Sequence, residues 1–115
     1  DPHCIERLFD QLISNSFKFR DPNKESLDIR ISSAIFNEKL ALVYEDNGIG
    51  LKTSELPYIF EPGFKAHNRP GDGLGLSIAK RIVETHNGEI SACSSGKNQG
   101  IRFTIKLPLP VNLVQ

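Results

Sequence analysis

The sequence lacks the features that would point to a redox, metal-binding, nucleic-acid-binding or membrane-spanning protein. It has only two cysteines, Cys4 and Cys93, and their wide separation favours reduced thiols over a disulfide or a metal site. Its formal net charge is zero, so it offers no basic surface for nucleic acid. No apolar run approaches the length of a membrane span, and no signal peptide is recognisable. We therefore expect a cytoplasmic domain, although an anchor elsewhere in the intact protein stays open.

The length and composition fit one ordinary globular domain. The chain has 115 residues, of which 38% are hydrophobic and 24% are charged, and this is enough for a single core. It begins at Asp1 without a methionine, which suggests a fragment of a longer protein. We expect the domain to occupy residues 1–109 and residues 110–115 to form a C-terminal tail.

Hydrophobic periodicity predicts two amphipathic helices. In the first, apolar residues recur at helical spacing from Ile5 to Phe17, and Asp1 is the expected cap. A polar stripe lies beside this apolar stripe and contains Gln11, Asn15 and Lys18. The second helix is expected to run from Leu76 to a stop at Gly88.

Four segments alternate between apolar and polar residues, as strands do. They are residues 27–32, 40–45, 89–94 and 101–107. Residues 37–39 and 95–100 are the expected turns, and the first strand is expected to be half-buried. A short helix is predicted within residues 53–60, where Pro57 limits its regularity. This order of elements fits a mixed sheet with helices on one face.

Five of the nine glycines lie in two clusters, Asp46-Asn47-Gly48-Ile49-Gly50 and Gly71-Asp72-Gly73-Leu74-Gly75-Leu76. The first cluster places a carboxylate at the end of a strand, where it can accept a hydrogen bond from the amino group of a base. The second opens a helix, whose backbone N–H groups and dipole favour phosphate. Together they outline a nucleotide site. Taken alone, Asn47-Gly48 also fits a hairpin turn and the second cluster also fits a loop hinge with a helix cap.

With two further motifs, these clusters resemble the ATP-binding catalytic domain of sensor histidine kinases. The further motifs are Asn15-Ser16-Phe17-Lys18-Phe19 and Ile59-Phe60-Glu61-Pro62. That domain belongs to the wider group of DNA gyrase, the heat-shock chaperone ATPases and MutL. The resemblance covers the chain from Leu8 to Pro108. It implies an α+β fold of the Bergerat type, a two-layer α/β sandwich with a mixed, mostly antiparallel sheet and ATP held between the helices and a lid.

The resemblance also implies roles for residues of the first helix and the first glycine cluster. Asp46 matches the residue that reads adenine, and Gly48 and Gly50 leave room for the ring and a bound water. Asn15 matches the Mg²⁺ ligand, which suits an ion that takes few protein ligands beside phosphate oxygens. Asn15 and Lys18 are the expected catalytic residues, with Lys18 near a phosphate, and Phe19 is expected to lie against the nucleoside. For the helix residues, a solvated edge that ends in a core phenylalanine is the alternative.

The phosphate end of the site is expected in the second cluster and in the loop before it. The residues that match the phosphate-contacting turn are Gly71, Gly73, Leu74, Gly75 and Leu76. Residues 64–72 match the lid, in which Lys65 or Arg69 can reach the γ-phosphate, with a solvated loop charge as the alternative for each. Phe60 is expected to pack beneath the lid. Asp72 and Ile101 depart from the family pattern, which has a small residue and a hydroxyl at those places.

The resemblance implies a protein-histidine kinase fragment that binds Mg-ATP and presents the γ-phosphoryl group to a histidine on a separate helical, dimerising domain. None of His3, His67 and His86 stands in the sequence context of a phosphoacceptor. A response regulator is the expected downstream partner, and the fragment itself is expected to be a monomer within a homodimeric protein. Gln11 stands where hydrolytic relatives have a water-activating glutamate, which disfavours an ATPase of the gyrase or chaperone branch. A degenerate nucleotide sensor or scaffold without phosphoryl transfer is the alternative.

Overall fold

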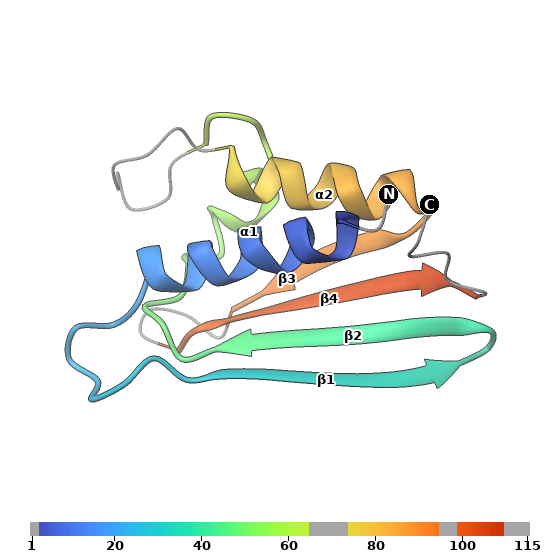
Figure 1. Cartoon of the computed structure of the whole chain (residues 1–115). Coiled ribbons are helices and arrows are strands. Elements are labelled where there is room, and N and C mark those ends of the chain that lie inside the picture. Colours follow the sequence, from blue (N-terminus) through green and yellow to red (C-terminus); the bar gives the residue numbers. More distant parts are fainter. Residues whose placement is uncertain (1–2, 65–73, 95–98, 110–115) are drawn as a thin grey trace.

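Two helices lie side by side over one face of a four-stranded sheet in the computed structural model, which describes residues 3–64, 74–94 and 99–109 (Figure 1). The helices are α1 (Cys4–Lys18) and α2 (Gly75–Thr85). The strands are β1 (Ile29–Phe36), β2 (Lys39–Asp46), β3 (Glu89–Cys93) and β4 (Ile101–Pro108). Their order is β1-β2-β4-β3, and all three pairings are antiparallel. The predicted two-layer α+β fold is confirmed, although no described strand makes the parallel pair that a mixed sheet requires.

The apolar stripe of α1 holds that helix on the sheet. Leu8, Leu12 and Ser16 recur every four residues and are its buried side chains, so they lie on one face of the helix. The helix begins at Cys4, later than predicted, and the expected cap at Asp1 lies outside the described residues. The polar stripe of α1 is left at the edge of the packing, as the sequence predicted.

A tight hairpin joins β1 to β2. Asn37 and Glu38 have φ angles of 50° and 61°, the left-handed conformations that a two-residue type I′ turn requires. Lys39 therefore pairs with Phe36 instead of lying in the turn. The alternative hairpin at Asn47 is wrong, because β2 ends at Asp46 and the next element in the chain is a helical turn instead of a strand that pairs back on β2.

The first strand is longer and more exposed than predicted. It reaches Phe36 because the hairpin pairing continues to the turn. The expectation of a half-buried strand is wrong for most of it: Ile31 is 49% exposed and Ile35 is 71% exposed. The reason is that β1 is an edge strand beyond the area covered by the two helices (Figure 1).

The predicted helix within residues 53–60 is reduced to one short 3₁₀ turn, η1 (Leu56–Tyr58). Pro57 lies in this turn, and its missing N–H and fixed φ prevent a longer regular helix here. The predicted end of α2 is confirmed, since the helix ends at Thr85 and the Gly88 N–H donates to the Val83 carbonyl at 3.0 Å.

The core lies between the helices and the inner face of β2 and β4. Tyr44 of β2 pairs with Phe103 of β4, and their ring centroids are 6.3 Å apart. Val83 of α2 and the two leucines of α1 close over these rings, and all are at most 1% exposed. Within the described ranges, no helix has the length and apolar character needed to cross a membrane.

The contrast between the covered and uncovered parts of the sheet predicts two different outcomes for the same substitution. Phe103→Ala removes a side chain that is 0% exposed, so it should lower the free energy of unfolding by about 3–5 kcal/mol. Phe36→Ala removes one that is 72% exposed and should change it by no more than about 0.5 kcal/mol. Urea denaturation measures both, and equal losses would mean that the helices do not cover the sheet as described.

Candidate functional site

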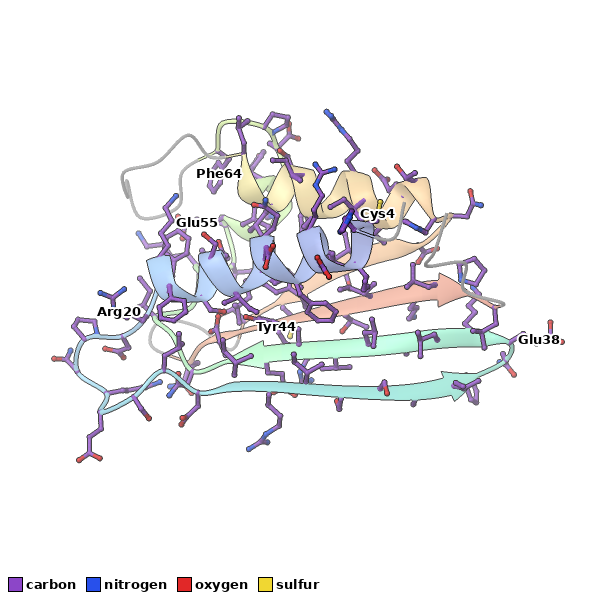
Figure 2. The ribbon with its side chains drawn as sticks, viewed as in Figure 1. Cys4, Arg20, Glu38, Tyr44, Glu55 and Phe64 are labelled. Carbon is purple, nitrogen blue, oxygen red and sulfur yellow. The ribbon has the colours of Figure 1, made fainter. Side chains whose placement is uncertain are left out.

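A cleft of about 280 Å³ opens between the two helices and the carboxyl end of β2. It brings together most of the residues singled out in the sequence. From the predicted site these are Asn15, Lys18, Phe19, Asp46, Gly50, Leu74, Gly75 and Leu76. Gln11, which disfavours the hydrolytic branches, and Ile101, which departs from the family pattern, line it as well. Phe64 also lines the cleft and lies close to the N-terminal end of α2 (Figure 2).

Two predicted residues do not line this cleft. Gly48 is buried behind the Asp46 carboxylate, to which its N–H donates a hydrogen bond. Phe60 packs against Phe103 in the core, with ring centroids 6.2 Å apart. The other predicted positions, Lys65, Arg69, Gly71, Asp72 and Gly73, lie outside the described residues.

The cleft also contains apolar residues that the sequence argument did not single out as site residues. Leu51, Ile59 and Ile78 line it together with Ser14 of α1. Leu51 and Ile59 also belong to the buried core, so the sequence gives no sign that they line a site as well. Their presence gives the cleft an apolar wall, which suits the flat face of an aromatic ligand.

The Asp46 carboxylate is held by three hydrogen bonds from three parts of the chain. Its Oδ1 atom accepts from the Gly48 N–H at 3.0 Å and from the Ile101 N–H at 3.2 Å. Its Oδ2 atom accepts from the Ser16 hydroxyl at 2.7 Å. A carboxylate fixed on several donors at a cleft wall is an oriented acceptor for a ligand's N–H group.

Close backbone approach makes this arrangement possible. A Cβ atom on Gly48 would lie 2.6 Å from the carbonyl oxygen of Phe19, so no other residue fits there without a shift. Gly100 has a φ angle of 74°, and a Cβ atom on it would collide with the Asp46 carbonyl oxygen. The Gly100 N–H donates to the Gly48 carbonyl at 2.9 Å, which holds the start of β4 against the end of β2.

The phenol of Tyr44 lies behind this carboxylate, between β2 and α1 (Figure 2). It is 1% exposed, and its oxygen lies 2.8 Å from the Ser16 hydroxyl oxygen. Burial raises the pKa of Tyr44 above its ordinary value of 10.0, because the charged phenolate loses its hydration. The hydrogen bond with Ser16 opposes this rise in pKa, and the nearby Asp46 charge adds to it.

The edge of α1 supplies the amide and the ammonium group of the cleft. The Asn15 side chain makes no hydrogen bond to another described residue, so its amide oxygen is available to a ligand. The Lys18 ammonium lies 5.5 Å from the centroid of the Phe19 ring. Within the described ranges, no group of three His, Cys, Asp or Glu side chains can hold a metal ion by itself. A cation in this cleft would therefore need further oxygen ligands from a bound phosphate and water.

The N-terminus of α2 also lines the cleft. The helix begins at Gly75, next to the side chain of Gln11: a Cβ atom on Gly75 would lie 3.1 Å from the Gln11 Oε1 atom. The N–H groups in the first turn of a helix have no acceptor within it, and the helix dipole adds partial positive charge. This part of the cleft therefore suits an anionic group.

A carboxylate fixed by three donors and a helix N-terminus in one cleft agree with the comparison of the sequence with known families. Residues 1–111 match the family described as "Histidine kinase-, DNA gyrase B-, and HSP90-like ATPase". The chain belongs to this family. Membership brings ATP binding with it, and the resemblance stated from the sequence motifs is confirmed.

The most informative relatives are sensor kinases. The chain is 34% identical to the sensor protein kinase WalK of Staphylococcus saprophyticus, over 96% of its own length and 19% of that protein. It is also 34% identical to a probable C4-dicarboxylate sensor kinase of Bacillus subtilis, over 95% of its length and 20% of that protein. The chain thus spans about a fifth of the length of these curated relatives.

Solved structures lead to the same kind of protein. The fold is similar to that of the mycobacterial sensor histidine kinase MprB, with a TM-score of 0.81 and 25% identity over 94% of this chain and 74% of that one. It is also similar to the catalytic domain of the histidine kinase ThkA, with a TM-score of 0.76 and 26% identity over 94% and 69% of the two chains. The chain is the ATP-binding catalytic domain of a sensor histidine kinase.

The buried phenol behind the site gives a direct test of its geometry. In a Tyr58→Phe variant Tyr44 is the only tyrosine, since the sequence has two, so the ultraviolet absorbance of phenolate reports Tyr44 alone. The titration midpoint should lie above 10.0 in the folded protein and return to about that value in urea.

The same shift in pKa makes stability depend on pH. Because the folded pKa of Tyr44 is raised, its contribution to stability is intact below pH 10.0 and is lost as the pH rises through the folded pKa. A titration midpoint of the Tyr44 phenol at or below 10.0 in the folded protein would show that the phenol is not buried against Ser16.

Proposed function

We propose that the chain binds ATP with Mg²⁺ and presents the γ-phosphoryl group to a histidine on a separate helical domain of the same protein. The observation that carries this proposal is that the fixed Asp46 carboxylate and the N-terminus of α2 line one cleft. A response regulator would receive the phosphoryl group next. This order of partners rests on the sensor-kinase relatives, which extend well beyond this chain.

Asp46 is the proposed reader of adenine. Its carboxylate accepts hydrogen bonds only, and adenine presents an amino group where guanine presents a carbonyl oxygen. A guanine would therefore place one acceptor against another and leave both unpaired, at a cost in affinity. Leu51 and Gly50 lie beside the carboxylate in the cleft lining and leave a partly apolar surface for the ring.

Asn15 and Lys18 are the proposed contacts to the metal and the phosphates. The amide oxygen of Asn15 suits Mg²⁺, which keeps several waters and takes most of its remaining ligands from phosphate. Lys18 and the first turn of α2 border the same cleft and would neutralise the negative charge of the triphosphate. Phosphoryl transfer depends chiefly on such positioning and charge neutralisation.

Gln11 supports transfer to a protein acceptor over hydrolysis of ATP. It lines the cleft between Asn15 and the start of α2, but a neutral amide cannot take a proton from water. Neither of the two described histidines, His3 and His86, lines the cleft. The His86 Nδ1 atom lies 2.9 Å from the Ile82 carbonyl oxygen at the end of α2. The nucleophile is therefore expected from another domain.

Removing the base-reading group should abolish selective ATP binding. Asp46→Ala should lower the affinity for ATP by at least about 100-fold, because no other side chain replaces the buried acceptor. Glu45→Ala is the matched control, since its carboxylate lies 3.4 Å from Arg102 on the opposite face of β2. Isothermal titration calorimetry on folded variants measures both. If the Asp46 variant keeps the ATP affinity of the parent, Asp46 does not bind the base.

The metal role and the transfer reaction can be tested together. The parent chain, mixed with the histidine-bearing helical domain and γ-labelled ATP, should yield acid-labile phosphohistidine on that domain and little free phosphate. Asn15→Ala should remove the effect of Mg²⁺ on ATP affinity and reduce transfer by about 100-fold or more. Asn23→Ala, in the exposed loop after α1, is the control.

Three outcomes of this experiment contradict parts of the proposal. Tight ATP binding by the parent without any transfer would favour a nucleotide sensor or scaffold. Steady release of phosphate by the chain alone would indicate an ATPase. An unchanged Mg²⁺ effect in the Asn15 variant would mean that another group holds the metal.

A further inference from the structure

One polar residue lies on the stripe of α1 that otherwise packs into the core. Ser16 follows Leu8 and Leu12 at four-residue spacing and is 0% exposed. Among the described side chains it is the buried polar residue of the core. A hydroxyl in such a place costs stability unless it is hydrogen-bonded, and Ser16 makes two hydrogen bonds, to Tyr44 and Asp46.

The direction of these hydrogen bonds follows from the protons that are available. A serine hydroxyl has one proton, and a carboxylate accepts hydrogen bonds only. The Ser16 proton is therefore directed to Asp46 Oδ2, at 2.7 Å. The Tyr44 hydroxyl, 2.8 Å from Ser16 Oγ, must then be the donor in the second bond. The three groups form a chain of donors that runs from Tyr44 through Ser16 to the carboxylate.

This chain of donors determines which lone pair of Asp46 faces the cleft. A carboxylate has about four acceptor positions, two on each oxygen. Oδ1 uses both of its positions for the N–H groups of Gly48 and Ile101. Oδ2 accepts from Ser16 and retains one position. The terminal torsion of an aspartate is otherwise broad, so the Ser16 bond selects the orientation in which this position is kept for a ligand.

We propose that Ser16 and Tyr44 are positioning residues for base recognition. They hold Asp46 so that its Oδ2 atom accepts a hydrogen bond from the amino group of adenine. The proposal rests on the proposed function, in which Asp46 reads that group. Neither Ser16 nor Tyr44 lines the cleft, so both act through Asp46 and not by contact with the nucleotide. Pre-orientation of this kind lowers the cost of binding, because the acceptor need not be ordered when the ligand arrives.

A purely structural role is the competing explanation, and a nucleotide analogue separates the two. Purine riboside triphosphate has the ring, ribose and phosphates of ATP but lacks the amino group. If Ser16 only supports packing, Ser16→Ala should weaken binding of ATP and of the analogue equally. If Ser16 orients the acceptor of the amino group, the variant should weaken ATP binding alone.

The experiment is isothermal titration of both nucleotides into the parent chain, Ser16→Ala, Tyr44→Phe and Ser33→Ala, with Mg²⁺ present. Ser16→Ala should lower ATP affinity about tenfold and change analogue affinity less than twofold. Tyr44→Phe keeps the Ser16–Asp46 bond and removes only the donor behind it, so it should act in the same direction by about two- to threefold. Ser33→Ala is the control, because Ser33 is exposed on the edge strand β1.

Each outcome bears on a different claim. Equal losses for the two nucleotides in Ser16→Ala, or no loss for either, would overturn the positioning role. Tyr44→Phe keeps the ring packed on Phe103, so misfolding would not explain a loss of ATP affinity in this variant. If the folded variant shows no preferential loss of ATP affinity, the role of Tyr44 is overturned. A parent that binds ATP and the analogue equally well would instead contradict the proposed reading of adenine by Asp46.

Discussion

The hydrogen bonds to the Asp46 carboxylate are the interaction on which the rest of the site depends. Their donors come from α1, from the loop after β2 and from the start of β4: Ser16, Gly48 and Ile101. All three can reach one side chain only because Asp46 and Ile101 are partners in the β2–β4 register and α1 packs directly on that sheet. Gly100 allows the last approach, since a side chain there would meet the Asp46 backbone. The packing that forms the fold therefore also orients the Asp46 carboxylate.

The same packing also determines which residues of α1 line the cleft. The apolar stripe of α1 faces the sheet, so its polar edge, with Gln11, Asn15 and Lys18, is turned toward the start of α2. This brings an amide oxygen and an ammonium group to the cleft that the N-terminus of α2 also lines, and among the described lining residues the only carboxylate is that of Asp46. A neutral amide at Gln11 cannot take a proton from water, and this agrees with the proposal that a partner domain completes the chemistry.

The sequence predicted the parts of the site that have a strong local signal. Asp46 before a glycine turn and the polar stripe of α1 were found because their spacing is regular, and the structure brings them together. Ser16 and Tyr44 were missed because their role depends on a pairing across the core, although a serine on an apolar helix stripe is a sign that a partner exists. The exposure of β1 was missed for a similar reason: alternation shows that a strand has two faces, but not whether a helix covers either of them.

A crystal structure of this chain with Mg²⁺ and a non-hydrolysable ATP analogue would show whether Oδ2 of Asp46, held by Ser16, accepts a hydrogen bond from the amino group of adenine, as we propose. We expect the adenine N6 atom within about 3 Å of Asp46 Oδ2, with the Ser16 hydrogen bond kept and the phosphates at the N-terminus of α2. An adenine ring bound away from Asp46, or a Ser16 hydroxyl turned from the carboxylate in the complex, would contradict it.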